Sequence, residues 1–132
     1  TTVSYELPEG YILTDDDLSG KKYYSDNDRV NVTISVVPYT WMTAADMAER
    51  ERGAGISKVI SSGQYEVSGV TFYYYTYSIL HIRGEKRSIT YHFNGYADLK
   101  NGDIYSVYGF ADDNPAAMEP DTYADFMKIN ME

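Results

Sequence analysis

The sequence lacks cysteine altogether, and it holds one tryptophan and no apolar run near the length of about 20 residues that a membrane-spanning helix needs. Without thiols the chain can form no disulfide, use no thiol nucleophile and bind no cysteine-ligated zinc. Basic residues are scarce too, because 11 Lys and Arg stand against 20 Asp and Glu and leave a net charge of -9. Since nucleic acids and anionic lipids both attract basic surfaces, we expect no nucleic-acid partner and no membrane contact by the domain itself.

Sequence motifs of catalysis are missing as well. The chain contains no G-x-S-x-G nucleophile motif and neither of the glycine-rich phosphate-binding loops. A carboxylate pair for glycoside hydrolysis is uninformative here, because 20 acidic residues always supply one. We therefore expect no enzyme activity, no catalytic residue and no cofactor.

The length of 132 residues is that of a single domain, residues 1–132, and a chain of this size buries about two-thirds of the surface that it exposes when unfolded. The chain opens Thr-Thr-Val-Ser without a methionine, and we expect that an export signal was removed upstream. The expected molecule is an extracytoplasmic monomer.

The residue in excess is tyrosine, with 15 Tyr against 4 Phe. Aromatic and β-branched residues fill Val70–Ile82, a composition that suits a strand with a half-buried, pleated surface. Large side chains occupy both its even and its odd positions, so we expect a central strand that is covered on each face.

Alternating patterns and turn residues predict an antiparallel sheet around this strand. We expect strands at Val3–Leu7, Lys21–Ser25, Arg29–Val37, Ser57–Val67, Val70–Ile82, Arg87–Asp98 and Asp103–Phe110. The polar segment Asp15–Gly20 is expected to be a loop. The last three strands form a meander whose turns lie at Gly84-Glu85 and Asn101-Gly102.

The clearest helix signal is the pair Thr43 and Asp46, which have the spacing of a capping box. The helix that they begin is expected to end at Arg50 or Arg52, before the glycines of Gly53-Ala54-Gly55. Its narrow apolar stripe predicts a helix that lies on a sheet.

A second helix is predicted over Thr122–Ile129, with Asp121 as its cap. The fold class expected is therefore α+β, an antiparallel β-sheet with helices packed on it. Trp41, just before the first helix, is expected to fill the core; an exposed ring for ligand stacking is the alternative.

Turn geometry predicts how the strands of the meander pair. A tight turn that pairs Arg83 with Lys86 places four further pairs across the two strands: Leu80 with Ile89, Thr76 with Phe93, Tyr77 with His92, and Tyr73 with Tyr96. Pairing Lys100 with Asp103 at the next turn places Tyr108 opposite Gly95, where the ring can cover the bare glycine.

Alternation then gathers aromatic side chains on one face of the adjacent strands, and this Tyr-rich face is the candidate ligand-binding surface: Tyr73, Tyr75, Tyr77, His92 and Tyr96. Two interpretations stay open. Helices cover the face and the rings belong to the core, or the face is partly open and binds a sugar or a peptide.

Metal sites are a weaker hypothesis. His81 and His92 are the only histidines, and without a cysteine or an obvious partner carboxylate they make a poor zinc site. Three acidic segments could offer oxygen ligands to calcium: Asp15-Asp16-Asp17, Asp26-Asn27-Asp28 and Asp112-Asp113-Asn114. None has the EF-hand spacing, and turn formation and capping explain all three. We expect no metal ligand.

The order of these segments resembles the PsbP-like fold, which is shared by the photosystem subunit PsbP, a Ran-binding nuclear-import factor and many bacterial exported lipoproteins. The family's opening pattern is matched by Tyr5-Glu6-Leu7-Pro8-Glu9-Gly10-Tyr11. A polar hairpin, a helix, the glycine turn Ser68-Gly69, a long meander and a closing helix with Phe126 follow in the family's order.

This resemblance covers nearly the whole chain and implies an α-β-α sandwich and a lipid anchor attached upstream, at the cell surface. It carries no catalytic site, because the family has no common one, and neither the PsbP metal ligands nor the Ran-contact residues can be matched. We expect a non-enzymatic exported binding or scaffold domain of a bacterial surface lipoprotein. The alternatives are a carbohydrate- or peptide-binding domain that uses the Tyr-rich face, and a small hydrolase; the partner would be a protein, a peptide or a carbohydrate.

Overall fold

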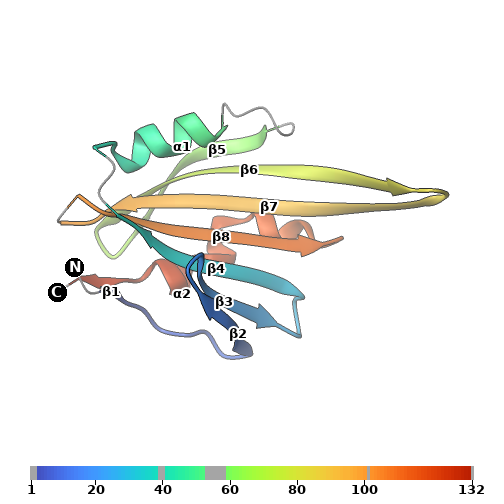
Figure 1. The fold of residues 1–132 in the computed structure, drawn as a ribbon, viewed down its shortest axis with the longest axis horizontal. Helices are drawn as coiled ribbons and strands as arrows, with labels where there is room; N and C mark the ends of the chain where they lie inside the picture. The colour runs from blue at the N-terminus through green and yellow to red at the C-terminus, as the bar shows by residue number, and fades with distance from the viewer. Residues whose placement is uncertain (1–2, 39–40, 53–58, 101, 132) are drawn as a thin grey trace.

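The computed structural model describes residues 3–38, 41–52, 59–100 and 102–131, and a seven-stranded antiparallel sheet dominates it (Figure 1). Across the sheet the strands run in the order β2-β3-β4-β8-β7-β6-β5. Their bounds are β2 (Tyr11–Asp17), β3 (Gly20–Ser25), β4 (Val30–Val37), β5 (Val59–Val67), β6 (Val70–Arg83), β7 (Lys86–Asp98) and β8 (Ile104–Asp112). Two short strands, β1 (Val3–Ser4) and β9 (Asn130–Met131), pair separately and bring the two ends of the chain together.

Helices are few. The longest helix among the described residues is α1 (Ala44–Arg52), and near the C-terminus two 3₁₀ turns, η1 (Pro115–Met118) and η2 (Pro120–Tyr123), lead into the one-turn helix α2 (Ala124–Met127). The expected antiparallel sheet with helices packed on it is therefore confirmed, but most of the ordered structure is strand. The second helix, predicted over Thr122–Ile129, is wrong in length. Only the four residues of α2 are α-helical, because the first two residues of the segment belong to η2 and the last two lead to β9.

The start of α1 follows the sequence signal and is tied to the sheet. The N–H of Asp46 donates to the Thr43 hydroxyl at 3.1 Å, and the N–H of Thr43 donates back to the Asp46 carboxylate at 3.4 Å. The N–H of Ala44 donates to the carboxylate of Asp98, at the end of β7, at 2.7 Å. These bonds satisfy N–H groups that a helix start otherwise leaves free. The predicted helix end at Gly53-Ala54-Gly55 lies outside the described residues.

The sheet has two faces with different covers. We call the side that carries α1 the helix face; α1 contacts β6 and β7 there. A compact cluster forms beneath it, of Ala44, Met47, Ala48, Tyr75, Tyr96 and Ile104. The other side, the C-terminal face, packs against η1, η2 and α2 and holds the larger core, with Phe72, Phe93, Tyr105, Val107, Tyr123 and Phe126 among its members.

The pairing of β6 with β7 is as predicted. Gly84 and Glu85 form a two-residue turn, with Gly84 at a φ of +64°, and Arg83 pairs with Lys86. From this turn the ladder gives the four expected pairs: Leu80 with Ile89, Thr76 with Phe93, Tyr77 with His92, and Tyr73 with Tyr96. The predicted tyrosines and His92 therefore do share one face, and it is the helix face.

The pairing of β7 with β8 differs from the prediction by one residue. Asp98 pairs with Ile104, and the N–H of Leu99 donates to the carbonyl of Asp103 at 2.9 Å, so the turn is longer than a two-residue loop. Asn101, which suggested the tight turn, lies outside the described residues. Tyr108 consequently pairs with Asn94 and not with Gly95, which moves its ring to the helix face.

Three smaller expectations are also corrected. Asp15–Gly20 was expected to be a loop, but Asp15 to Asp17 extend β2 because they pair with β3 past a bulge. The strand expected over Val3–Leu7 is confined to β1, since the chain leaves its partner β9 after two residues. The strand at Val70–Ile82 is interior but not central, because β8 occupies the middle of the sheet. Residues 57 and 58 of the strand expected over Ser57–Val67 lie outside the described residues.

A close contact in the C-terminal face locks η2 to the sheet. The ring of Tyr123 stacks on Phe93 with centroids 4.6 Å apart, and its hydroxyl donates to the carbonyl of Ala117 at 2.5 Å. The fully buried ring lies directly over Gly109, so a β-carbon at that position would overlap it. Glycine is required at 109 by this close approach.

We therefore expect Gly109→Ala to lower the free energy of unfolding by about 1–3 kcal/mol, because the added methyl overpacks the core. Gly63→Ala in β5 is the matched control, since a β-carbon there meets the Tyr74 hydroxyl only at 3.4 Å. Urea unfolding curves of the two variants measure the difference. Equal stability of both variants would contradict the contact between Tyr123 and Gly109.

Candidate functional site

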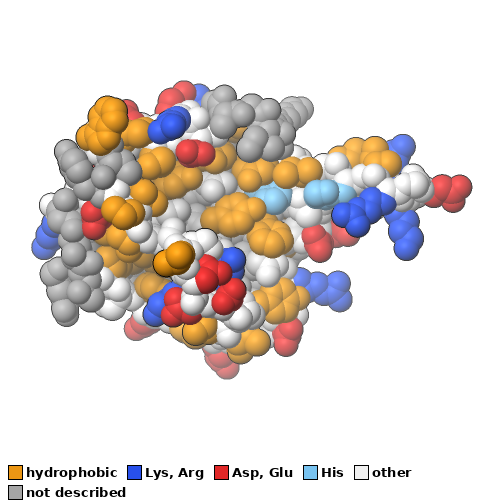
Figure 2. Space-filling model, in the orientation of Figure 1, with side chains coloured by type: hydrophobic (Ala, Val, Ile, Leu, Met, Phe, Trp, Pro, Cys, Tyr) orange, Lys and Arg blue, Asp and Glu red, His pale blue; other side chains and the backbone are white. Residues whose placement is uncertain are grey.

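The helix face is only partly covered by its helix. α1 lies over the end of the sheet that carries Tyr75 and Tyr96, which are 7% and 8% exposed and belong to the core. Beyond the helix, no other described helix covers this face toward the β6–β7 turn, and Figure 2 shows hydrophobic side chains there beside the two histidines. We call this part the open aromatic surface and define it by four residues: Tyr77, His92, Tyr108 and Phe110.

His92 is the centre of this surface, and rings surround it. Tyr77 on β6 stacks on the imidazole with centroids 4.6 Å apart and planes 4° from parallel. On the other side Phe110 and Tyr108 of β8 lie at 5.8 and 6.0 Å, tilted by 19° and 28°. The rings stand side by side across three strands, because the β6–β7 and β7–β8 registers bring them to one face. His92 itself is 7% exposed, whereas the other three rings are half-buried.

A chain of hydrogen bonds runs through His92. Its Nδ1 lies 2.8 Å from the Tyr108 hydroxyl, and its Nε2 lies 2.7 Å from the hydroxyl of Thr90. The same Thr90 oxygen lies 3.0 Å from Nε2 of His81 on β6. Each hydroxyl can both donate and accept, so a neutral His92 is fully satisfied by one donor and one acceptor. These hydrogen bonds link the exposed His81 to the half-buried Tyr108.

Electrostatics keep His92 and Tyr108 neutral. The pKa of His92 is lowered from 6.5 to about 4. Burial is the largest cause, the neighbouring His81 acts in the same direction, and Asp112 opposes the shift. Burial, with a contribution from Tyr77, raises the pKa of Tyr108 well above its usual value of 10. At neutral pH the surface therefore offers uncharged rings and hydroxyl groups.

A hollow extends the open aromatic surface toward the β2–β3 hairpin. It has a volume of about 400 Å³, and Tyr108 and Phe110 form one wall. The other lining residues include Thr14, Ser19, Asn31 and Thr33, whose side chains can donate or accept hydrogen bonds. Aromatic rings and polar groups thus meet in one concave region, which is the usual composition of a small-ligand site.

The structure separates the five residues that the sequence proposed as a binding set. Tyr77 and His92 lie in the open aromatic surface, Tyr75 and Tyr96 lie beneath α1, and the half-buried Tyr73 lines a hollow at the edge of α1. The sequence argument did not include Tyr108 and Phe110, because the one-residue slip at the β7–β8 turn placed them on the opposite face. It did not include Thr90 either, although its position two residues before His92 on one strand face was a usable signal.

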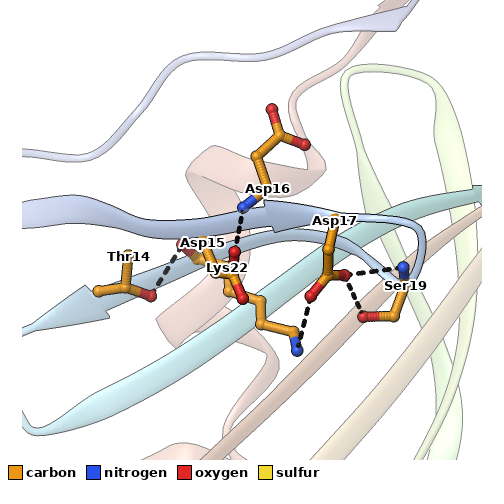
Figure 3. Close-up of polar contacts among 6 residues, drawn as sticks. All are labelled: Thr14, Asp15, Asp16, Asp17, Ser19 and Lys22. Carbon is orange, nitrogen blue, oxygen red and sulfur yellow. Dashed lines mark hydrogen bonds and ion pairs between the residues drawn. The ribbon is translucent and has the colours of Figure 1, made fainter.

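The acidic segment of the β2–β3 hairpin is engaged in holding its own turn (Figure 3). The carboxylate of Asp17 accepts from the hydroxyl and the N–H of Ser19 at 2.5 and 2.8 Å and lies 3.5 Å from the Lys22 ammonium. The hydroxyl and N–H of Ser19 lower the pKa of Asp17 to about 2. Asp16 points away from Asp15 and Asp17, as alternation along a strand requires.

No group of three or more His, Asp or Glu side chains in the described part of the chain is arranged to hold a metal ion. The Asx residues of the other two acidic segments serve turns as well. Asn114 caps η1 by accepting from the N–H of Ala116 at 3.1 Å, and its amide donates to the carbonyl of Asp28 at 2.8 Å.

Trp41 was expected to fill the core, and this prediction is wrong. Its side chain is 86% exposed, and its backbone has a φ of +58°. The small residues of α1, Ala44 and Ala48, make the contact with the sheet in its place. The alternative of an exposed ring at the start of α1 is the arrangement observed.

Comparisons with known proteins give a likeness of fold. No family model matches this chain, and no curated protein matches it in sequence. Among solved structures, the fold is similar to that of LpqN, a protein involved in cell envelope biogenesis of Mycobacterium tuberculosis, with a TM-score of 0.51. The likeness covers 96% of this chain and 77% of LpqN at 10% sequence identity. Within the described residues, no helix is both long enough and apolar enough to cross a bilayer.

The cover over Tyr75 has a measurable consequence. We expect Tyr75→Ala to lower the free energy of unfolding by roughly 3–5 kcal/mol, as truncation of a large buried ring does. Trp41→Ala, which removes a larger but exposed ring, should change it by no more than about 0.5 kcal/mol. Thermal or urea unfolding of both variants checks the pair, and a Tyr75→Ala protein as stable as the parent would show that α1 does not seal this part of the face.

The depressed pKa of His92 predicts a loss of stability in acid. In the unfolded chain the imidazole takes up a proton near pH 6.5, whereas in the folded chain it does so only near pH 4. The unfolded state therefore binds more protons between these values, and stability falls as the pH falls through this window. His92→Gln, which retains an amide for hydrogen bonding, should remove this part of the slope.

Urea unfolding at neutral pH and near pH 4 measures the slope for the parent and for His92→Gln. NMR titration of the His92 ring supplies an independent check, with an expected midpoint near 4. A midpoint near 6.5, or equal slopes in the two proteins, would show that the imidazole is not buried among the rings.

Proposed function

We propose that this chain is a non-enzymatic binding domain and that its ligand is a glycan that lies on the open aromatic surface. The observation that carries the proposal is the incomplete cover of the helix face. α1 seals Tyr75 and Tyr96, yet Tyr77, Tyr108 and Phe110 stay half-exposed on the same face. A contiguous group of exposed rings on a soluble domain is typical of a binding site.

The chemistry of this surface suits a sugar. A sugar offers C–H groups that pack on aromatic rings, and hydroxyl groups that pair with tyrosine, threonine and asparagine side chains. The hollow beside Tyr108 and Phe110 supplies such side chains in Asn31 and Thr33. An extended peptide is the less suitable ligand, because strand addition needs a free sheet edge and this surface lies on the interior strands β6, β7 and β8.

Catalytic turnover is not part of the proposal. A small hydrolase would need a nucleophile, and the hydroxyl nearest to both histidines is that of Thr90, which is 9% exposed and bonded to His81 and His92. A panel of ester, amide and glycoside substrates tests this part, and activity that is lost in both His81→Ala and His92→Ala would overturn it.

We propose further that the domain works outside the cytoplasm, carried on a lipid anchor upstream of Thr1. The resemblance to the PsbP-like fold, with its α-β-α sandwich, supports this: α1 and the C-terminal segment would be the two outer layers. The likeness to LpqN, a protein of cell envelope biogenesis, supports it as well. A signal peptide followed by a lipid-accepting cysteine in the complete reading frame would test the anchor directly.

We expect the purified domain to bind at least one class of oligosaccharide on a glycan array, and Tyr77→Ala to weaken that binding about tenfold or more, as loss of an interface ring does. Tyr91→Ala is the matched control. Tyr91 is also half-buried and adjoins His92 on β7, but it points to the opposite face of the sheet. Calorimetric titration with the best array ligand measures both variants. Equal weakening by the two substitutions would contradict the location of the site.

A further inference from the structure

The β6–β7 hairpin extends beyond the rest of the sheet (Figure 1). A pocket lies at the outer end of this hairpin. The pocket has a volume of about 550 Å³, which is within the usual range for a small-ligand site. Seven residues line it: His81, Arg83, Lys86, Arg87, Ser88, Thr90 and Asp112. Most of them belong to the helix face, since odd positions of β6 and even positions of β7 point to that side.

The charge of this pocket is opposite to that of the molecule. Arg83 and Lys86 bring two cationic side chains to it from the helix face, Arg87 lines it from a β7 position that alternation assigns to the opposite face, and Asp112 brings one carboxylate. The chain as a whole carries a net charge of -9. Figure 2 shows Lys and Arg side chains gathered toward this end of the molecule.

The cations of the pocket are not used inside the protein. The ion pairs among the described residues join Lys22 to Asp17 and Arg52 to Glu49, so none of the three pocket cations has a carboxylate partner there. Clustered cations repel one another, and an anion placed between them relieves this repulsion. The Arg83 guanidinium beside Lys86 is well suited to a carboxylate or a phosphate group, because it can donate two parallel hydrogen bonds.

The pocket is continuous with the open aromatic surface. His81 and Thr90 line the pocket, and the Thr90 hydroxyl that bonds to His81 at 3.0 Å also bonds to His92 at 2.7 Å. Along β7 the distance from Thr90 to His92 is one step on the same strand face, about 7 Å. A ligand that rests on the rings around His92 can therefore place its next group over the cations.

We propose that the domain recognises an acidic glycan, with an acidic group held by Arg83 and Lys86 while a neighbouring sugar lies on the open aromatic surface. This inference rests on the proposed function and names the class of its ligand. The shared chemistry is an anionic oxygen group on a sugar chain, either a carboxylate or a phosphate. An anionic bilayer is a poorer partner, since the net charge of -9 and the exposed Asp112 and Glu85 at this end oppose its approach.

The test compares three probes of similar length: oligogalacturonate, which carries carboxylates, phosphorylated dextran, and neutral dextran. We expect at least one acidic probe to bind about tenfold or more tightly than neutral dextran, and added salt to weaken only the acidic probe. The triple variant Arg83→Gln/Lys86→Gln/Arg87→Gln should lose this preference. Because the three side chains are solvent-accessible at a hairpin end, its thermal melt should match that of the parent.

The matched control is Lys21→Gln/Lys100→Gln/Lys128→Gln, which removes the same charge from exposed positions outside the pocket. It should keep the affinity for the acidic probe within about twofold of the parent, since distant surface charges are screened. Equal losses in the two triple variants would overturn the inference, because they would show attraction to overall charge and not to the pocket.

The outcomes separate this inference from the proposed function. Equal binding of acidic and neutral probes, weakened by Tyr77→Ala, would overturn the inference and leave glycan binding intact. Absence of binding to any glycan would overturn both. Binding to anionic vesicles that is lost in the pocket variant, with no glycan binding, would assign the pocket to lipid. A change in oligomeric state of the pocket variant, seen by size-exclusion chromatography with light scattering, would assign it to a second copy of this chain; either result overturns the inference.

Discussion

The pairing of β6 with β7 is the constraint on which the rest of this structure depends. Its two-residue turn at Gly84-Glu85 sets the ladder, and side chains alternate strictly along both strands. Every large residue of the longest hairpin is thereby assigned to one face. Tyr75 and Tyr96 go to the side that α1 covers, and Phe93 goes to the side that the C-terminal segment covers. A shift of one residue in the β6–β7 register would move the buried rings of one strand to the opposite face, and this would disrupt the clusters on both faces of the sheet.

The two faces are covered by unequal means. The C-terminal face receives η1, η2, α2 and the segment after β1, and its aromatic rings are tied in by their hydroxyls, as when Tyr105 donates to the carbonyl of Phe126 at 2.8 Å. Among the described residues, α1 alone covers the helix face, and its alanines and Met47 contact β6 and β7 at one end. A helix of nine residues is too short to cover a sheet of seven strands, so no described helix covers the remaining part of this face.

The open part of the face is organised around a buried polar group. His92 is enclosed by rings but keeps two hydrogen bonds, to Thr90 and to the Tyr108 hydroxyl. A buried imidazole without partners would cost free energy, and these bonds offset that cost and orient the rings. The result is an uncharged aromatic surface that adjoins a cationic pocket through Thr90 and His81.

Local signals in the sequence determined the elements: the capping pair Thr43 and Asp46, the strand at Val70–Ile82 and the tight turn at Gly84-Glu85 are each encoded by neighbouring residues, and the β6–β7 pairing follows from them. The β7–β8 register did not follow, because the turn after Asp98 is closed by a bond from Leu99 to Asp103 that no dipeptide signal specifies. Which rings are covered was also decided only by the tertiary structure. Tyr75 and Tyr77 are equivalent in an alternating pattern, and the reach of α1 across the sheet makes one a core residue and leaves the other on the surface.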